Sequence, residues 1–163
     1  MTNPEPLDSS DLETFMHLHA IKGEFLHLEV PTPTVEAAAQ AVGTSPNRIV
    51  KSILFLVDTE PILAISCGSL YVDVRSIATF YKVGRKRVKL ASPETVLRET
   101  GFEVGAMPPF GHYHPLPTLM DRRVLEQPNV YAGGGAENVL IHLSPENILR
   151  VTGAEVMDLI NPP

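Results

Sequence analysis

Two strongly apolar segments, separated by only four residues, dominate the middle of the chain. Their sequences are IVKSILFLV at 49–57 and ILAIS at 62–66, and the intervening DTEP is typical of a tight turn. Alternate positions of a strand face opposite sides of its sheet, and here both sets of positions are largely apolar. The sequence therefore predicts a β-hairpin covered on both faces, which requires further structure on each side of one sheet.

Short helices and strands alternate along the rest of the chain. The first helix is expected from Ser10 up to Gly23, and a strand at 25–30 follows it. Further helix starts are marked by residues that cap helices, namely Thr34, Asp73 and the Ser-Pro pairs at 92–93 and 144–145. We therefore expect a single α/β domain over residues 1–163, with a mixed, curled and partly barrel-like sheet flanked by short helices, and residues 1–7 as a loose tail.

The charge of the chain is acidic as a whole but basic in one segment. A net charge of −6 argues against a general polyanion binder, yet five of the 13 lysines and arginines fall within residues 82–89, KVGRKRVK. This segment could hold a phosphate backbone locally. The other interpretation is a solvated strand edge, where lysine guards against edge-to-edge pairing. The sequence leaves both interpretations open.

Other composition features exclude several classes of protein. The single Cys67 rules out an internal disulfide framework and fits a reducing compartment. With no recognisable base partner, it is better interpreted as a small apolar side chain than as a nucleophile. No apolar run approaches the roughly 20 residues that span a bilayer. We expect a cytoplasmic protein without membrane contact. The six histidines lack a zinc-ligand pattern, so we expect no metal and no cofactor.

Lys51 is the most informative single residue, because it interrupts the first apolar segment. A lysine in a strand covered on both faces is costly unless it reaches water or has a partner. A structural interpretation places Lys51 near the exposed start of the strand, where the ammonium reaches water. A functional interpretation makes it a cation at the mouth of a pocket, placed to meet a phosphate or a carbonyl group.

The segment FEVGAMPPFG at 102–111 combines flexibility and stiffness within one loop. Gly105 and Gly111 permit backbone conformations and close approaches that a Cβ forbids. Pro108 and Pro109 fix their own φ angles and extend the residue before each of them. The loop is thus either a well-specified turn or a segment that must hold its backbone in a defined shape for a ligand.

Three segments together resemble the YbaK/ProX family of aminoacyl-tRNA editing domains. They are RIVKSILFLVD, GFEVGAMPPFG and GGGAENVLIHLSPENILRVTGA, and the intervening YVDVRSIATFYKVGRKRVKLASPETV fits the same pattern. The resemblance covers roughly residues 24–160. It implies a mixed-sheet α/β fold and hydrolysis of the ester that joins a wrong amino acid to tRNA. Glu137 and Asn138 depart from the family pattern, which has basic or small residues there, and this questions a tRNA contact from that hairpin.

The resemblance also implies the residues of the site. Lys51 matches the strand lysine of the family, and Gly105 begins its G-x-x-x-P loop, so these two are the expected catalytic residues. Ester hydrolysis passes through an oxyanion that needs preorganised donors, which the loop backbone would supply. The expected substrate-binding residues are Ala106, Met107, Pro108, Pro109 and Gly134. The expected tRNA-binding residues are Arg85, Lys86, Arg87 and Lys89.

The function implied by this resemblance is that of a free-standing, trans-editing deacylase. The resemblance implies tRNA(Pro) carrying alanine or cysteine as its substrate. Hydrolytic editing suits selection by size, because a methylene gives a synthetase only about 1–3 kcal/mol of discrimination and a second site must remove the errors. The alternative is a non-catalytic tRNA- or nucleotide-binding module on the same fold. The expected partners are the aminoacylated 3′ end of tRNA and a prolyl-tRNA synthetase, with the protein acting as a monomer or a homodimer.

Overall fold

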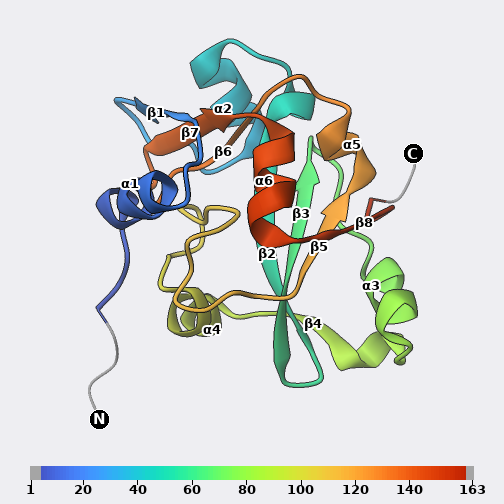
Figure 1. Cartoon of the computed structure of the whole chain (residues 1–163). Coiled ribbons are helices and arrows are strands. Elements are labelled where there is room, and N and C mark those ends of the chain that lie inside the picture. Colours follow the sequence, from blue (N-terminus) through green and yellow to red (C-terminus); the bar gives the residue numbers. More distant parts are fainter. Residues whose placement is uncertain (1–4, 161–163) are drawn as a thin grey trace.

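The hairpin predicted from the sequence forms the centre of the fold (Figure 1). In the computed structural model, which describes residues 5–160, strand β2 (Val50–Val57) pairs antiparallel with β3 (Glu60–Cys67). Their register places Lys51 opposite Ser66. Apolar side chains of both strands are buried on both faces, so the prediction of a doubly covered hairpin is confirmed.

The strands form two sheets. β2 and β3 belong to a five-stranded sheet with the order β4-β2-β3-β5-β8, in which the pairs β3–β5 and β5–β8 are parallel and the others antiparallel. A three-stranded antiparallel sheet with the order β1-β7-β6 lies next to it, linked by an isolated bridge between Ile49 and Tyr131. The remaining strands are β1 (Glu24–His27), β4 (Val88–Leu90), β5 (Thr118–Asp121), β6 (Val130–Gly133), β7 (Val139–Leu143) and β8 (Glu155–Met157). The mixed α/β fold is therefore as predicted, but the described strands do not close into a barrel.

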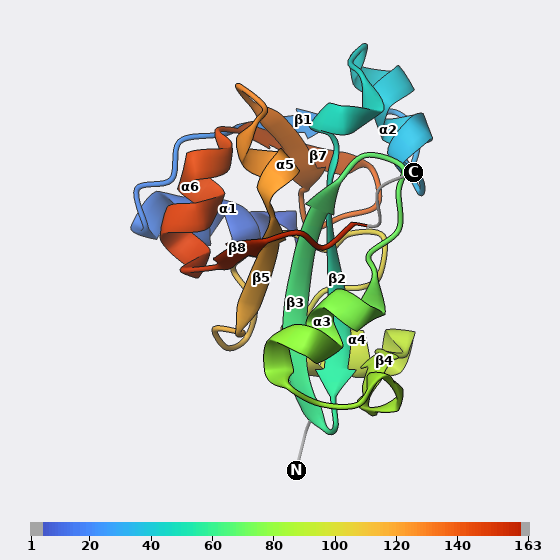
Figure 2. The same cartoon turned by 90° about the vertical axis from the view of Figure 1, so that its right-hand side faces the viewer.

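Helices cover three sides of these sheets (Figure 2). Leu12 of α1 and Ile148 of α6 join the core on one face of the β2–β3 hairpin, while Ile77 of α3 packs on the other face. α2 packs through Ala38 and Ala39 on the three-stranded sheet. The helices are α1 (Ser9–Leu18), α2 (Val35–Val42), α3 (Val74–Tyr81), α4 (Pro93–Thr100), α5 (Arg122–Leu125) and α6 (Pro145–Thr152), with two 3₁₀ turns at Pro46–Arg48 and Arg85–Arg87.

The predicted capping residues begin their helices, and α1 is the exception to the predicted boundaries. The side chains of all four predicted caps accept an N–H of the following turn; these caps are Thr34, Asp73, Ser92 and Ser144. α1 is instead capped by Asp8 and ends at Leu18, before the predicted stop at Gly23, because Ala20 adopts a positive φ of 52°. Residues 1–4 of the expected tail lie outside the described residues. Leu7 is not loose, since its N–H donates to the Gly101 carbonyl at 2.7 Å.

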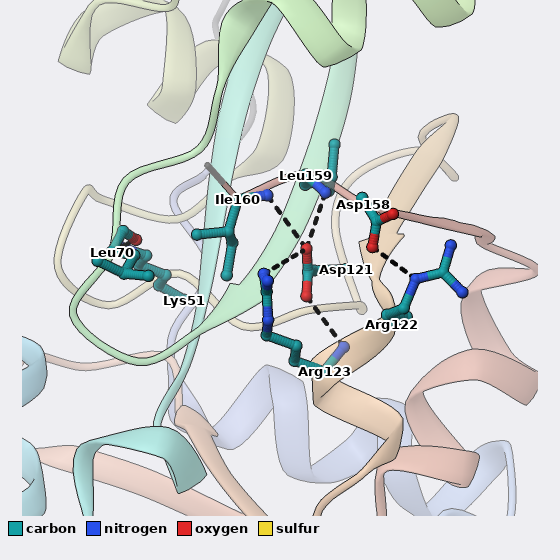
Figure 3. A network of polar contacts seen from close by, with 8 residues as sticks. All are labelled: Lys51, Leu70, Asp121, Arg122, Arg123, Asp158, Leu159 and Ile160. Atoms are coloured by element: carbon teal, nitrogen blue, oxygen red, sulfur yellow. Dashed lines mark hydrogen bonds and ion pairs between the residues drawn. The ribbon is translucent and has the colours of Figure 1, made fainter. Parts of the chain in front are cut away.

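A buried carboxylate at the end of β5 ties separate segments together (Figure 3). Asp121 is 0% exposed. Its Oδ1 accepts the N–H of Arg123 at 2.9 Å, and its Oδ2 accepts those of Leu159 at 2.8 Å and Ile160 at 3.1 Å. A charge taken out of water is costly unless it is hydrogen-bonded, and three backbone donors meet that requirement here. Asp121 thereby joins the start of α5 to the segment that follows β8.

Replacement of Asp121 tests this role in stability. Asp121→Ala leaves three backbone N–H groups without their acceptor, so the free energy of unfolding should fall by roughly 3 kcal/mol or more. Asp158, whose side chain is 67% exposed and pairs with Arg122, provides the matched control, and Asp158→Ala should cost less than about 1 kcal/mol. Urea denaturation of both variants measures the difference, and equal losses would contradict the assigned role. Asp121→Asn, which keeps an acceptor oxygen, should be intermediate.

Candidate active site

One pocket of about 440 Å³ brings together the two residues expected to be catalytic. Lys51 at the start of β2 and Gly105 in the loop between α4 and β5 both line it, although they are 54 positions apart in the chain. The start of α2, the segment after β3 and the end of β6 complete the walls. This volume lies within the range typical of small-molecule sites. The resemblance implied both residues, and the structure places them in one cavity.

The ammonium group of Lys51 is held by the protein and keeps donors for a ligand. Its Nζ donates to the Leu70 carbonyl at 2.6 Å and lies 5.5 Å from the centre of the Tyr71 ring. Burial lowers the pKa of Lys51, and the charge of Glu36 partly opposes this shift. An ammonium has three donors, so one bond to Leu70 leaves two for a bound molecule. Lys51 is thus an oriented cation and does not simply extend into water.

An acidic residue that the sequence did not single out lies at the same pocket. Glu36 belongs to the first turn of α2. A hydrogen bond from the Ser69 side chain lowers the pKa of Glu36, with a smaller contribution from Lys51. Thr34 marks the start of this helix in the sequence, but no local signal places that start against β2. The pocket therefore holds one cation and one anion, both of which a zwitterionic or polar ligand would meet.

The loop at residues 105–107 offers backbone donors to the pocket. Gly105 has a φ of +93° and is exposed, and a Cβ added to it would meet no atom within 4 Å. The N–H of Ala106 donates to the Glu103 carbonyl at 3.1 Å, while the Ala106 carbonyl accepts from the Gly135 N–H at 2.9 Å. The N–H groups of Gly105 and Met107 remain as the candidate donors to a ligand.

A histidine behind the loop fixes its proline segment. His112 Nε2 lies 2.9 Å from the Pro108 carbonyl and must carry the proton, because a carbonyl oxygen only accepts. Burial lowers the pKa of His112 to about 4, so the ring is neutral near pH 7. Its ring also meets the edge of Phe102, with centroids 6.1 Å apart. The loop is therefore held by a side chain as well as by its own two prolines.

The three consecutive glycines of the β6–β7 hairpin each have a different close neighbour. A Cβ on Gly133 would lie 2.2 Å from the Met107 carbonyl oxygen, and one on Gly134 would lie 2.6 Å from Cγ1 of Val139. A Cβ on Gly135 would lie 2.8 Å from the backbone nitrogen of Ser9, at the start of α1. Gly133 lines the pocket, whereas Gly134, the predicted substrate-binding residue, packs within its own hairpin. Which of the three glycines lines the pocket depends on tertiary contacts, and a run of identical residues in the sequence does not indicate them.

Of the other predicted substrate-binding residues, one lines the pocket and three do not. Met107 lines the pocket with Lys51. Ala106 and Pro108 are buried and do not belong to its lining. Pro109 lines a separate cavity of about 500 Å³. These three residues therefore support the loop from behind and do not line the pocket.

The basic segment lies at the opposite end of the hairpin from Lys51 (Figure 2). The predicted tRNA-binding residues are all exposed, namely Arg85, Lys86, Arg87 and Lys89. β4 pairs with β2 between Phe55 and Val57, which lie four to six residues along the strand from Lys51 and hence about 13–20 Å away. Arg87 forms a two-bond ion pair with Asp58 in the turn of the hairpin. The segment is thus separate from the pocket, and one of the four predicted tRNA-binding residues is already paired.

Two other expectations concern Cys67 and metal ions. Cys67 is buried, and burial raises its pKa to about 11, so the thiol stays protonated and does not act as a nucleophile. Within residues 5–160, no three histidine, cysteine, aspartate or glutamate side chains are grouped so that they could hold a metal ion. The expected independence of metals and cofactors stays a prediction. No helix in the described part of the chain is long and apolar enough to cross a bilayer.

Comparison with known proteins identifies the family. Residues 29–151 match the family described as the aminoacyl-tRNA editing domain. The chain belongs to this family. The matched range contains both Lys51 and the loop that begins at Gly105, so the pocket lies within the part of the chain that carries the family features.

Individual relatives agree with membership of the editing domain family. The chain is 31% identical over 137 residues to the uncharacterized protein YwhH of Bacillus subtilis, covering 83% of this chain and 85% of that protein. It is 24% identical over 127 residues to the "Putative Cys-tRNA(Pro)/Cys-tRNA(Cys) deacylase EbsC" of Enterococcus faecalis, covering 77% and 76% of the two chains. A crystal structure described as "a putative trans-editing enzyme for prolyl tRNA synthetase" superimposes with a TM-score of 0.85 at 31% identity, over 94% of this chain and 97% of that chain.

These comparisons confirm the resemblance and the fold class. The structural match extends over nearly the whole chain, and the family description supports an aminoacyl-tRNA deacylase, a hydrolase acting on the ester of aminoacyl-tRNA. Of Glu137 and Asn138, which depart from the expected family pattern, only Asn138 makes a structural contact through its side chain, while Glu137 contributes its backbone carbonyl. The Asn138 side chain donates to the Leu28 carbonyl at 3.0 Å, and the Glu137 carbonyl accepts from Thr32 at 3.1 Å. They fix the segment that leads into α2 at the edge of the pocket.

Gly105→Ala tests whether the loop backbone borders the reacting group. The new methyl group would project into open space, so it should obstruct a bound ester without clashing with the protein. We expect deacylation of aminoacyl-tRNA to fall by at least about tenfold, because small misplacements of a reacting group are costly. Gly153→Ala is the matched control, since Gly153 also has a positive φ, of 63°, and open space around its Cβ position, yet lies outside this pocket. Both variants should lose some stability from backbone strain. Equal deacylation by the two would remove Gly105 from the site.

Proposed function

We propose that the protein is a free-standing deacylase that hydrolyses the ester of mischarged tRNA, with tRNA(Pro) carrying alanine or cysteine as its substrate. The observation that carries this proposal is the shared pocket of Lys51 and Gly105 in a chain of the editing domain family. The names of two relatives support the finer assignment. One refers to Cys-tRNA(Pro), and the other to trans-editing for prolyl tRNA synthetase.

The proposed reaction needs no protein nucleophile. Water attacks the ester carbonyl, and the oxygen of that carbonyl gains negative charge in the tetrahedral intermediate. The Lys51 ammonium and the N–H groups of Gly105 and Met107 stabilise this oxyanion as preorganised donors. The bond to the terminal ribose oxygen of the tRNA then breaks, and that oxygen takes one proton of the water. The amino acid is released as its carboxylate, and the second proton passes to solvent. The neighbouring hydroxyl of the same ribose assists the water, in place of a basic side chain.

The tRNA body is proposed to contact the basic segment at the far end of the hairpin. Arg85, Lys86 and Lys89 are exposed there, while Arg87 is paired with Asp58. A single-stranded 3′ end that enters the pocket leaves the double-stranded stem outside, where only such surface cations can reach its phosphates. The association with a prolyl-tRNA synthetase, the cytoplasmic location and the choice between monomer and homodimer stay predictions from the sequence.

Lys51→Met tests the proposed function directly. The substitution keeps most of the side-chain volume but removes the ammonium, so release of alanine from Ala-tRNA(Pro) should fall by about 10²-fold or more while the melting temperature changes little. Lys22→Met, at an exposed lysine outside the pocket, is the matched control and should keep full activity. The assay should include Cys-tRNA(Pro), which the wild-type protein should also hydrolyse. It should also include correctly charged Pro-tRNA(Pro), which should stay intact.

Three results would count against this assignment. Full activity in Lys51→Met removes the ammonium from the reaction. Loss of the fold in that variant makes the lysine structural. A wild-type protein that binds tRNA(Pro) but releases no amino acid from any of these substrates favours the alternative, a non-catalytic tRNA-binding module.

The salt dependence of tRNA binding tests the basic segment. Each phosphate contact should contribute about −0.7 to −0.9 to the slope of log K against log salt concentration. The double variant Lys86→Ala, Lys89→Ala should therefore flatten the slope by roughly 1.5. Arg87→Ala should change it less, because that guanidinium is already paired with Asp58. Filter binding at several salt concentrations measures the slopes, and an unchanged slope in the double variant would limit these lysines to solubility and protection of the sheet edge.

A further inference from the structure

The most exposed large apolar side chain at the rim of the pocket is aromatic. Tyr71 lines the pocket next to Lys51 and is 86% exposed, and Val104 on the loop side of the pocket is 58% exposed. Aromatic side chains stabilise a fold when they are buried, so a tyrosine exposed to this degree contributes little to folding. The rim of the pocket thus presents apolar surface on both of its sides.

The backbone beneath Tyr71 is fixed, although its side chain is exposed. The carbonyl of the preceding Leu70 accepts from Lys51 at 2.6 Å. The following Val72 forms an antiparallel bridge with Ile160. Tyr71 is therefore held between two anchored neighbours. An aromatic ring presented to solvent from a fixed backbone has the form of a stacking platform.

We propose that Tyr71 stacks on the nucleobase of the terminal nucleotide of the tRNA substrate, and that Val104 closes the opposite side of the same subsite. This inference rests on the proposed function, because it places a base only where an aminoacyl ester enters the pocket. The ligand chemistry is that of a nucleoside whose ribose carries the acyl group. Recognition through the face of the ring requires no particular pattern of hydrogen bonds.

The position of the ring fits the covalent structure of such a substrate. The terminal ribose carries both the ester and the base, so the base must lie within the span of one ribose from the ester carbonyl. The Lys51 ammonium, which is proposed to contact that carbonyl, lies 5.5 Å from the centre of the Tyr71 ring. An ester bound at Lys51 therefore brings its base to Tyr71 and not to the distant basic segment.

Hydrolysis of two small esters separates this role from a general one in catalysis. The probes are the alanyl ester of adenosine and the alanyl ester of methyl riboside, which lacks the base. Wild-type protein should prefer the adenosine ester in kcat/KM. Tyr71→Ala should lower kcat/KM, through KM, by about 5- to 150-fold more for the adenosine ester than for the riboside ester, because only the adenosine ester loses a stacked base. Tyr71→Phe keeps the aromatic face and should behave as wild type.

Phe80→Ala provides the control for loss of an exposed aromatic ring, since Phe80 is 40% exposed on α3 and lies outside this pocket. It should hydrolyse both esters normally. Two results would overturn the proposal. Equal losses on both esters in Tyr71→Ala would mean that the ring acts only through Lys51, and no loss on either would mean that it contacts no substrate.

Binding of adenosine distinguishes failure of this subsite from failure of the deacylase proposal. If wild-type protein hydrolyses neither ester, adenosine binding is measured by nuclear magnetic resonance on the wild-type protein and the variants. Binding by wild type and Tyr71→Phe, with loss in Tyr71→Ala, would support the base subsite even without hydrolysis. Absence of binding in the wild-type protein would reject it.

Discussion

The buried carboxylate of Asp121 is the interaction on which the candidate site depends. It holds the N–H groups of Leu159 and Ile160 (Figure 3). Ile160 in turn forms an antiparallel bridge with Val72, just before α3. The two residues that precede Val72 contact the ammonium of Lys51. One charge, fully removed from water and satisfied by backbone donors, thus fixes a chain of contacts that ends at a second charge in the pocket. Asp121 stabilises the scaffold, and the Lys51 ammonium is left for the ligand.

Local sequence determines the parts of this fold that depend on local chemistry. The hairpin and the capped helices follow from periodicity and from side chains such as Ser92 and Ser144 that bond their own first turn. β8 (Glu155–Met157) was not predicted, because it is a short strand with weak apolar character that is held by parallel pairing to β5. Such a strand forms because it pairs with residues that are distant in the chain, and its own sequence carries no clear strand signal.

The same distinction applies to the site. The interpretation of Lys51 from the residues alone stayed divided between water and a ligand, and only the resemblance paired it with Gly105. Glu36 and Tyr71 had no signal at all, since an acid in a first helical turn and a tyrosine before a helix are common on any surface. Their place at the pocket results from the packing of α2 and from the segment after β3, which are tertiary features.

The contact between Gly133 and the Met107 carbonyl has a consequence for how such sites diverge. A Cβ at position 133 would lie 2.2 Å from the Met107 carbonyl oxygen, so no side chain fits there. The loop at 105–109 and the β6–β7 hairpin therefore pack together as a single unit. A loop taken from a relative would place its backbone carbonyl groups at different positions, against a hairpin that fits the loop of this chain. Recombination or engineering that aims at a new amino-acid preference must therefore move the two segments together, and homologues should have inherited them as a pair.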